Sequence, residues 1–516
     1  MFAPLPTPRE MAAWDKAAVA LGIPEMLLME NAARAAACVL FETFGPVAGR
    51  HVLLFMGAGN NGGDAACLAR HLRDAGAETL VLHTRPLGHY RGITAQHLRL
   101  ARRCGVTFLP AAAWPARFGN SLWQRPDVVV DGLIGTGFSG LLRDPEAGLV
   151  EQINQLGRRA YILALDIPSG LDGMTGRPSP VAVRATATAC FAAAKPGLVV
   201  PEAAPYTGCL HVRDIGLPRL VRESLPPSFR LIEADLLRCL PEPGALWHKG
   251  RAGHVVVAGG SEGLCGAPHL AALGALRAGA GLVTVAAPGP LIEAIRGAVP
   301  EIMSHALGAS WGPDSGPALA ALLARAQALV LGPGLGRSPE AGQALASILA
   351  LPDRPPAVID ADALSVLAST PSCLSLLRRD DMLTPHPGEA ASLLNRDNSQ
   401  GRGSLSVQAD RCAALRELLA LAPSIWVLKG AGTLIGRQGD PVSLCPLAAP
   451  NLAVGGSGDV LAGCAAALIA QRLAPDLAAC AAVLLHAKAG RWLAERYPHR
   501  GNLASDIAAA LAAMPR

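Results

Sequence analysis

The sequence predicts an α/β protein made of two doubly wound domains. Short apolar runs alternate with helical patterns along most of the 516-residue chain, and many of these runs end in a corner that contains glycine or aspartate. Such alternation indicates a mostly parallel sheet between helices. The proline-interrupted stretch 216–247 divides the pattern, and the chain is too long for one ordinary domain. We therefore expect a first domain at residues 1–220 and a second at 221–516.

Composition narrows the classes of function. The chain is 51% hydrophobic and 16% charged, which is typical of a globular protein. Its net charge is only +5, and it has no basic stripe with interleaved aromatic residues, so we expect no nucleic-acid partner. The 12 cysteines include no C-x-x-C pair, which favours free thiols. Residues 1–16 carry no apolar signal region and the run 460–470 is too short to span a bilayer, so we expect a cytoplasmic protein without membrane contact.

The elements of the first domain follow one another in the order expected for a parallel sheet. Helical spacing covers residues 8–45, where the first helix presents one face to the core. Strands are then predicted at 51–56, 79–83, 127–131 and 161–165, and the stretch 184–197 is interpreted as the last strand and its corner. This corner contains Lys195, which is either an anion contact or a solvated side chain.

The loop after the first strand contains the spacing G-x-G-x-x-G at Gly57, Gly59 and Gly62. Read literally, this spacing indicates an NAD-dependent dehydrogenase. The acidic residue that should accompany it, Glu78, precedes the second strand instead of ending it. An acid at that place cannot reach a ribose at the carboxyl edge of the sheet, so the dehydrogenase interpretation is disfavoured.

Polar residues at three strand ends predict a site. Asn61, Asp131, Asp166 and Ser169 follow strands whose carboxyl ends meet at one edge of a parallel sheet. A single aspartate after a strand is usually a turn former, but three such corners favour a site. Their oxygen ligands suit a monovalent or alkaline-earth cation better than zinc.

The motifs G-x-G-N-N-G-G-D at 57–64, D-G-L-I-G-T-G at 131–137 and D-I-P-S-G-L at 166–171 resemble those of the NAD(P)H-hydrate epimerase family, a Rossmann-like fold. The likeness covers about residues 9–215. It implies a potassium ion held by Asn61, Asp131 and Ser169, with Asp166 as the candidate proton-transfer group. One departure is Ala65, where the family usually has glycine. The implied hydrate-binding residues are Asn60, Asn61, Gly62, Gly63, Asp64, Gly135, Thr136, Gly137, Phe138, Ser139, Gly140, Leu141 and Asp166.

The second domain repeats the alternation. Strands are predicted at 254–258, 282–286, 328–331, 357–359, 382–384 and 426–428. Neither the G-x-x-x-x-G-K-[ST] loop nor the protein-kinase motifs occur. Three glycine corners, at 332–334, 429–433 and 455–459, would let backbone approach phosphates closely. Each alone is explained by a tight turn, but together they favour a nucleotide site.

Asp459 follows the small residues Gly455-Gly-Ser-Gly at the predicted start of a buried helix. The unpaired N–H groups of such a helix start suit a phosphate, and the carboxylate would be a base for an attacking hydroxyl. The alternative is an aspartate that only caps the helix. His386 lies in a Pro-His-Pro sequence that fixes its backbone. A lone histidine is more often a structural hydrogen bonder, and substrate contact is the other interpretation.

Residues from about 225 to 513 resemble the ribokinase-like superfamily and, within it, the ADP/ATP-dependent NAD(P)H-hydrate dehydratase family. The likeness rests on H-K-G at 248–250, G-P-G-L-G at 332–336, T-P-H-P-G-E at 384–389, K-G-x-G-T at 429–433 and G-S-G-D at 456–459. At Leu264-Cys265 the family often has a tyrosine. The implied hydrate contacts are Ala267, Gly334, His386 and Asp459, and the implied nucleotide contacts are Lys429, Gly430, Ala431, Gly432, Thr433 and Gly458.

Together the two likenesses imply repair of hydrated NADH and NADPH. The hydrate carries a hydroxyl on the carbon beside the ring nitrogen. Phosphorylation of this hydroxyl by ADP or ATP, with magnesium, would make it a better leaving group, and elimination would restore the double bond. The first domain would interconvert the R and S hydrates so that the second can use the S form. We also expect a homo-oligomer.

Two alternatives remain open at this stage. The second domain could be a small-molecule kinase that resembles hydroxyethylthiazole kinase and releases a stable phosphorylated product. The first domain could be a non-catalytic nucleotide-binding or interaction module.

Overall fold

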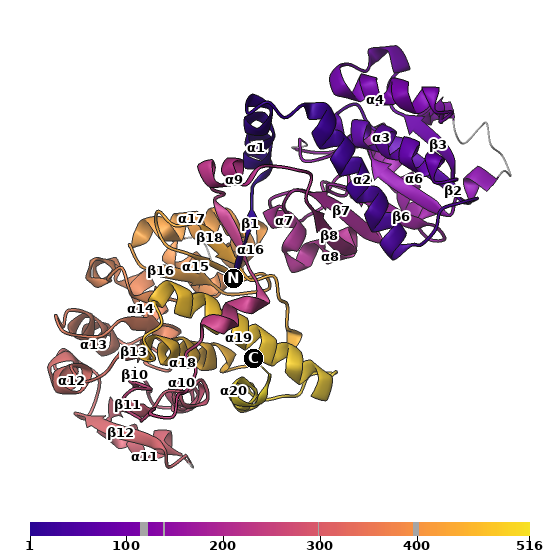
Figure 1. The fold of residues 1–516 in the computed structure, drawn as a ribbon. Helices are drawn as coiled ribbons and strands as arrows, with labels where there is room; N and C mark the ends of the chain where they lie inside the picture. Colours follow the sequence, from indigo (N-terminus) through magenta and orange to yellow (C-terminus); the bar gives the residue numbers. More distant parts are fainter. Residues whose placement is uncertain (114–121, 138–139, 298, 396–401, 516) are drawn as a thin grey trace. The chain divides into compact units, whose positions relative to one another are not determined.

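The computed structural model describes residues 1–113, 122–137, 140–297, 299–395 and 402–515 (Figure 1). The chain divides into two compact units, Pro4–Phe229 and a second unit made of Met1–Ala3 with Arg230–Arg516. We call them the first and the second unit. The division into functional domains at residues 220 and 221 stays a prediction.

The first unit contains a seven-stranded sheet, within the described residues, in the order β4-β3-β2-β5-β6-β7-β8. All neighbouring strands are parallel. The predicted strands are confirmed, but the strand in the stretch 184–197 is not the last one, because β8 follows it in the chain and pairs with β7. The strands are β2 (His51–Met56), β3 (Glu78–His83), β4 (Thr107–Pro110), β5 (Val128–Gly132), β6 (Tyr161–Leu165), β7 (Ala187–Phe191) and β8 (Cys209–Arg213).

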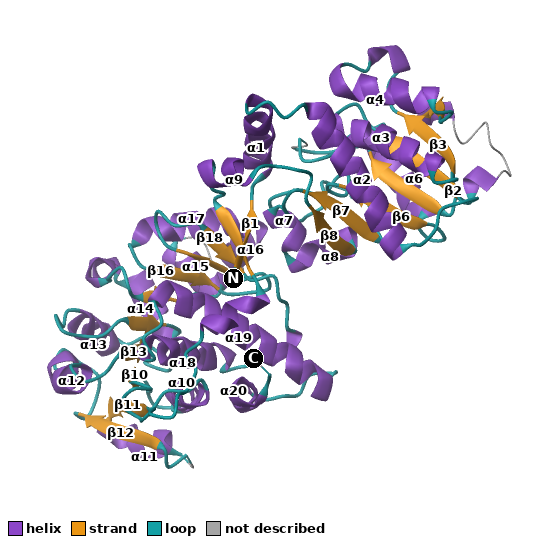
Figure 2. Ribbon diagram, in the orientation of Figure 1, coloured by secondary structure: helices purple, strands orange, loops and turns teal. Residues whose placement is uncertain are grey.

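Helices cover both faces of this sheet, because its central strands are apolar on both sides. Leu54 and Met56 of β2 pack in a cluster with residues of α2 and α3, whereas Leu53 and Phe55 pack in a cluster with residues of α6. Figure 2 shows the strands between the two helical layers. The helices are α1 (Pro8–Ala20), α2 (Glu25–Thr43), α3 (Asn60–Asp74), α4 (Gly92–Arg103), α6 (Glu146–Leu156), α7 (Pro196–Val199), α8 (Ala204–Thr207) and α9 (Arg219–Ser224).

The second unit contains an eleven-stranded sheet, within the described residues, in the order β1-β9-β18-β17-β16-β15-β14-β13-β10-β11-β12. Strands β10 to β16 are parallel, and β17 is antiparallel to both β16 and β18. The predicted parallel strands are confirmed. The strands are β1 (Phe2–Leu5), β9 (Phe229–Ile232), β10 (His254–Ala258), β11 (Leu282–Pro288), β12 (Ile302–Leu307), β13 (Ala328–Leu331), β14 (Ala357–Ile359), β15 (Met382–Leu383), β16 (Ile425–Leu428), β17 (Leu434–Gly436) and β18 (Val442–Leu444).

A pair of small-residue helices, α10 and α18, lies in the core of the second unit. A Cβ atom added at Gly463 of α18 would lie 1.9 Å from the Ala271 carbonyl oxygen, and one at Gly274 of α10 would lie 2.5 Å from that of Val460. The two backbones therefore touch, which only glycine permits at these points. The helices are α10 (Gly266–Arg277), α11 (Ile292–Arg296), α12 (Ser315–Leu323), α13 (Pro339–Leu349), α14 (Asp362–Ser369), α15 (Pro387–Leu393), α16 (Arg402–Ala409), α17 (Arg411–Leu421), α18 (Ser457–Ala470), α19 (Pro475–Arg496) and α20 (Ala504–Ala513).

Helix α19 is the one helix among the described residues whose length and composition would allow it to cross a membrane. Of its most apolar window, 72% is buried inside the fold. It contributes many residues, Ala478 to Leu485 among them, to the main core of the second unit.

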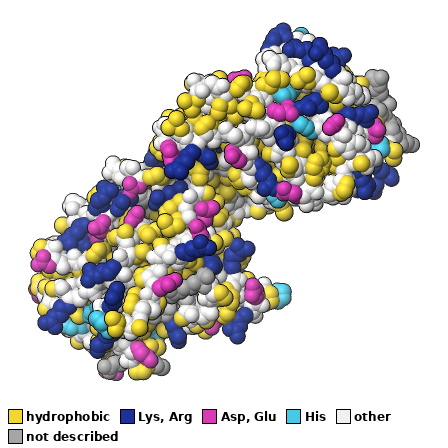
Figure 3. All heavy atoms as spheres, in the orientation of Figure 1, with side chains coloured by type: hydrophobic (Ala, Val, Ile, Leu, Met, Phe, Trp, Pro, Cys, Tyr) yellow, Lys and Arg dark blue, Asp and Glu magenta, His cyan; other side chains and the backbone are white. Residues whose placement is uncertain are grey.

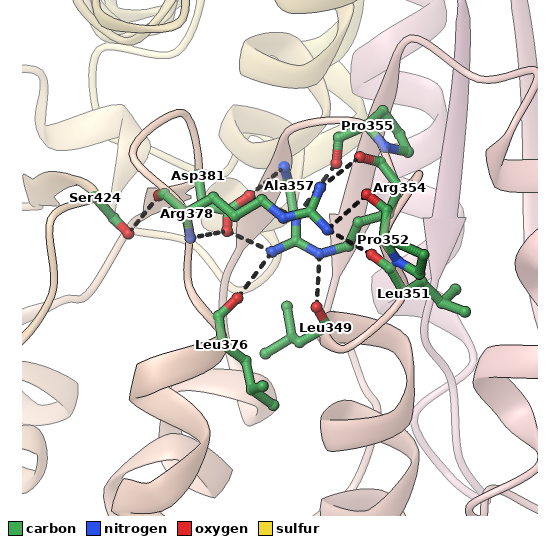
Figure 4. A network of polar contacts seen from close by, with 10 residues as sticks. All are labelled: Leu349, Leu351, Pro352, Arg354, Pro355, Ala357, Leu376, Arg378, Asp381 and Ser424. Atoms are coloured by element: carbon green, nitrogen blue, oxygen red, sulfur yellow. Dashed lines mark hydrogen bonds and ion pairs between the residues drawn. The ribbon is translucent and has the colours of Figure 1, made fainter.

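A buried ion pair ties together the amino ends of three strands of the second unit (Figure 4). Arg354 donates to both carboxylate oxygens of Asp381, at 2.7 Å each, and neither side chain is exposed. Asp381 also accepts the backbone N–H groups of Ala357, where β14 begins, and of Arg378. Ser424, just before β16, donates to the Arg378 carbonyl. This network, which we call the Arg354 network, satisfies two buried charges at the amino ends of these strands.

Charged side chains are interspersed over the face of the molecule seen in Figure 3, with a gathering of basic side chains over α4. The stretch 216–247, predicted as a linker with one short helix, contains α9, β9 and a 3-10 helix at Ala234–Cys239.

Candidate functional site

The first unit has a cavity of about 930 Å³. It lies where the polar corners of the sheet meet, as the sequence predicts. Helix α1 also contributes to its wall, which the sequence does not predict. The polar lining includes Asp15, Lys16, Glu25, Asn60, Asn61, Asp64, Thr136, Asp166 and Lys195.

Asn61, Asp131 and Ser169 form the part of the site predicted to hold potassium. The Asp131 carboxylate is fully buried and accepts the hydroxyl of Ser169 at 2.6 Å and its backbone N–H at 2.7 Å. Burial raises the pKa of Asp131 to about 6, against the lowering effect of these hydrogen bonds.

Both polar atoms of the Asn61 side chain are buried without a hydrogen-bond partner in the described structure. The Asn61 side chain lies beside Gly135, and the preceding Ile134 donates its N–H to the Ser169 hydroxyl. An orphaned amide beside this loop, with a buried carboxylate and a hydroxyl, offers oxygen ligands of the kind a hard cation takes. The residues therefore fit a potassium ion.

Asp166 and Lys195 form an ion pair in the cavity. The Lys195 side chain is fully buried, so the interpretation as a solvated lysine is wrong. Burial lowers the pKa of Lys195, but attraction to Asp166 outweighs it and raises the pKa. Asp166 has the left-handed backbone conformation, with φ of 60°. Such strain is common where a side chain is aimed at a ligand.

Four further carboxyl groups line this cavity, those of Asp15, Glu25, Asp64 and Glu146, and two of them have raised pKa values. Burial, with repulsion from Asp166, raises the pKa of Asp15 to about 6, partly offset by Lys195. Burial, with repulsion from Asp166 and Asp15, raises the pKa of Asp64 well above its ordinary value. The sequence analysis places Asp64 in the site but interprets Asp15 as part of a packing helix. A carboxyl group on the same face of α1 as the apolar Met11, Trp14 and Ala18 is the sequence feature from which Asp15 could have been predicted as a site residue.

The other predicted hydrate contacts fall into three groups. Asn60, Gly135, Thr136, Gly137 and Leu141 line the cavity. Gly62 and Gly63 are buried in the first turn of α3, where a Cβ on Gly62 would lie 2.0 Å from the Gly57 carbonyl oxygen. Gly140 is described but is not part of the lining, and Phe138 and Ser139 lie outside the described residues. The methyl group of Ala65 is fully buried.

A second polar cluster, on α2 and α3, contains Glu30, Cys67 and His71, whose ligand atoms lie within 4.8 Å of one another. Arg70 already donates to both oxygens of the Glu30 carboxylate. A divalent cation there would meet this positive charge, so we interpret the cluster as an ion-paired contact between the helices.

In the second unit, Asp459 lies in the first turn of α18, whose N-cap Gly456 has φ of 84°. Burial and repulsion from Asp360 raise the pKa of Asp459 to about 7, against the lowering effect of Lys429. Gly458 lies beside the same groups, since a Cβ there would be 3.2 Å from the Lys429 amine and 3.4 Å from an Asp360 oxygen. The helix start, the acid and the lysine thus meet at one corner.

Lys429 is held by two carboxylates that the sequence analysis does not place in the site. Its amine lies 2.7 Å from Asp360 and 3.8 Å from Glu389. Burial lowers and these charges raise the pKa of Lys429, with a net rise. Burial raises the pKa of Glu389 to about 7. Asp360 and Glu389 each lie in the corner after a strand of the sheet. This position is the sequence feature from which both could have been predicted as site residues.

The remaining predicted contacts lie close to this corner or support it. His386 caps α15, because its Nδ1 accepts the backbone N–H of Gly388 at 2.9 Å. A Cβ on Gly334 would lie 3.4 Å from that of Ala267, so these two lie side by side. Arg411 donates to the carbonyls of Leu428, Lys429 and Gly432, which fixes the loop 429–433. In that loop Gly430 and Gly432 have positive φ, Ala431 is exposed and Thr433 donates to the Gly430 carbonyl.

Two α/β units, each with buried ionisable groups where strands of its sheet end, define a two-site α/β enzyme. Family models match both halves: YjeF-related protein N-terminus matches residues 25–197, and NAD(P)H-hydrate dehydratase matches residues 255–512. The bifunctional NAD(P)H-hydrate repair enzyme of Coxiella burnetii is 38% identical over 97% of this chain and 96% of its own length. That of Escherichia coli is 35% identical over 95% and 90%. The chain belongs to the family of bifunctional NAD(P)H-hydrate repair enzymes.

Solved structures resemble the second half of the chain. A ribokinase-like superfamily protein of Enterococcus faecalis has a TM-score of 0.47 and 26% identity, over 55% of this chain and 94% of that one. The ADP/ATP-dependent NAD(P)H-hydrate dehydratase of Bacillus subtilis has a TM-score of 0.44 and 26% identity, over 54% and 93%. Because the repair enzymes align along nearly the whole chain, the alternative of a hydroxyethylthiazole-kinase-like enzyme fused to a non-catalytic module is not favoured.

Proposed function

We propose that this chain repairs hydrated NADH and NADPH in two reactions at two sites. The first unit interconverts the R and S hydrates, and the second unit dehydrates the S form with ADP or ATP as phosphoryl donor. The observation that carries the proposal is the corner where Asp459, Lys429 and the start of α18 meet, because it combines a base, a cation and backbone N–H groups.

In the second unit, Asp459 accepts the proton of the hydrate hydroxyl while the oxygen attacks the terminal phosphorus of the nucleotide. Lys429, fixed by Asp360 and Glu389, offers positive charge to the phosphoryl oxygens. The phosphate then leaves with the C–O bonding electrons, the neighbouring ring carbon gives up a proton to solvent, and the electrons of that C–H bond restore the ring double bond. Magnesium would neutralise phosphate charge when bound, and the carboxylates of this corner are ligands of the kind it takes.

In the first unit, Asp166 is the proton-transfer group, held by Lys195. Potassium bound by Asn61, Asp131 and Ser169 would fix the polar corner of the cavity, because it would compensate the buried Asp131 carboxylate. The proposal also includes a cytoplasmic location and a homo-oligomer. The expectations of no nucleic-acid partner and no membrane contact stay predictions.

The deciding experiment supplies a mixture of R and S NADH hydrates with ADP, and separately with ATP, and follows the recovery of reduced-nicotinamide absorbance. We expect full recovery from both epimers. Recovery that stops at the S fraction would contradict the epimerase reaction, and a stable phosphorylated product without recovery would contradict the dehydratase reaction.

Exchange of potassium for a bulky organic cation should slow epimerisation and lower the melting temperature of the first unit. Without the ion the buried Asp131 carboxylate lacks a counter-charge. The check is calorimetry and an epimerisation assay in potassium and in tetramethylammonium salts. Asn61→Ala should remove most of the difference between the salts, and an equal response in that variant would exclude Asn61 as a ligand.

Asp166→Asn should slow epimerisation by about 100-fold or more, because general acid–base groups contribute about 10²–10⁴-fold. Dehydration of pure S hydrate should be unchanged, since Asp459 lies in the other unit. Separate assays on the R and S hydrates measure both effects. A parallel loss of dehydration in a folded variant would contradict two independent sites.

A further inference from the structure

Asp15 is a cavity residue outside every motif of the first unit. It lies on α1, before the family match begins at residue 25, yet it lines the same cavity as Asp166 and Lys195. Helix α1 is firmly anchored, because Thr7 and Glu10 form a capping box at its start and Trp14 is fully buried. A carboxyl group is therefore held at a fixed place in the cavity wall.

Asp15 and Asp166 differ in their partners. Asp166 is ion-paired with Lys195 and accepts the backbone N–H of Phe191. For the Asp15 side chain, no hydrogen bond and no ion pair is found among the described residues. The charged groups that act on it are Asp166, Lys195 and Glu25, and it also interacts with the Asp64 carboxyl group. Lys195 is thus paired with Asp166, and Asp15 has the less favourable environment for a negative charge. Such a difference between two carboxyl groups in one site commonly makes one of them the acid and the other the base.

The proposed epimerisation needs both an acid and a base in the cavity. Inversion at the carbon beside the ring nitrogen can proceed by loss of the hydroxyl and addition of water to the other face. The hydroxyl must receive a proton as it leaves, because hydroxide is a poor leaving group, and the water that adds must lose one. Because the hydroxyl leaves from one face of the ring and the water adds to the other, a group at each face would serve these two proton transfers.

We propose that Asp15 is the acid of the epimerase site: its carboxyl proton passes to the departing hydroxyl, while the carboxylate of Asp166 accepts the proton of the water that adds. The C–O bond breaks with its electrons on oxygen to give water, and the nitrogen lone pair forms a C=N bond. Addition of water returns these electrons to nitrogen. The two carboxyl groups exchange roles in the reverse direction, so no other reactant is consumed. This inference rests on the proposed epimerase function.

Asp64 is the buried one among the competing candidates, which also include Glu25 and Glu146, and its burial disfavours it. Only 8% of the residue is exposed, and burial raises its pKa well above the ordinary value, so its proton exchanges with solvent less readily than that of Asp15. Asp15 is half-buried and has a pKa of about 6, so it can be recharged from solvent and can also release its proton near neutral pH.

The test compares Asp15→Asn, Asp15→Glu and the control Asp74→Asn, which replaces an exposed carboxylate at the end of α3. For Asp15→Asn we expect epimerisation kcat to fall by about 10²–10⁴-fold with KM within about threefold of wild type. Wild-type kcat/KM should decline as pH rises above about 6, and this decline should be absent in Asp15→Asn. Asp15→Glu should restore both the rate and the decline in part.

Solvent labelled with ¹⁸O provides a second readout that depends on no variant. The wild-type enzyme should place one solvent oxygen in the inverted hydrate, because the C–O bond breaks. Retention of the original oxygen, or an Asp15→Asn rate within about threefold of wild type, would overturn the inference. If Asp15→Asn does not fold, the pH profile of Asp15→Glu and the oxygen label test whether Asp15 is the acid. A wild-type enzyme that does not epimerise would instead refute the underlying function.

Discussion

Asp459→Asn is expected to abolish dehydration while epimerisation continues at the wild-type rate. The amide cannot accept the hydroxyl proton, and loss of a general base costs about 10²–10⁴-fold in rate. The carboxyl group is also a sensitive probe of pH, because its pKa of about 7 means that the basic form grows as pH rises through neutrality. Wild-type kcat/KM for dehydration should therefore rise over this range, and the residual activity of the variant should not.

The measurement uses pure S hydrate with ADP, and pure R hydrate without nucleotide for the epimerase. Asp476→Asn, at the half-buried start of α19, is a suitable control because its carboxylate lies outside the site. If both reactions of a folded Asp459→Asn protein fell together, the assignment of one reaction to each unit would be wrong. Asp459→Asn should still bind nucleotide, and this result would show that the variant is defective in catalysis and not in binding.

Asp381→Asn is expected to destabilise the second unit by about 3–5 kcal/mol, because it leaves the buried Arg354 guanidinium without its counter-charge. The melting temperature of this unit should fall by about 10 °C. Calorimetry of the full chain is the measurement, and the transition of the first unit provides an internal reference. Dehydration well below the transition should be preserved, since the Arg354 network lies at the amino ends of the strands.

Glu223→Gln provides a comparison with an exposed ion pair, and its shift is measured in a separate protein from the transition of the first unit, where α9 lies. Glu223 pairs with Arg219 on α9, where both side chains are more than half exposed, and such pairs contribute about 0–1 kcal/mol. An Asp381→Asn shift no larger than that of Glu223→Gln would mean that the Arg354 network contributes little. The free energy of unfolding of the Asp381→Asn/Arg354→Leu double variant should fall by less than the sum of the decreases in the two single variants.

The strands predicted from sequence are those with uninterrupted apolar runs, such as β2, β10 and β13, because a strand buried on both faces needs no polar residue. Strand β12 escapes prediction because it lies at the sheet edge and carries half-exposed polar residues, Ser304 and His305. Strands β17 and β18 have three residues each, too few for a period to appear.

The site is predictable where one motif contains the whole arrangement and not where the partners are distant. Gly456 to Asp459 is continuous, so both the helix start and its acid are readable. The Lys429–Asp360 pair joins residues 69 positions apart, and Asp166 and Lys195 are 29 apart. Neither partner's sequence neighbourhood shows whether a charge is buried. That information comes only from the packing of the whole unit.

The backbone contact between α10 and α18 has a consequence for how the second unit can evolve. Asp459 is placed by a helix that rests on its neighbour through Gly274 and Gly463, with no side chain between to absorb a change. Even a single methyl group at either glycine would push the helices apart and displace the catalytic acid from Lys429. Substitution of either glycine can therefore inactivate this site, although neither residue is a predicted contact of substrate or nucleotide. A mutational screen confined to polar residues would miss both positions.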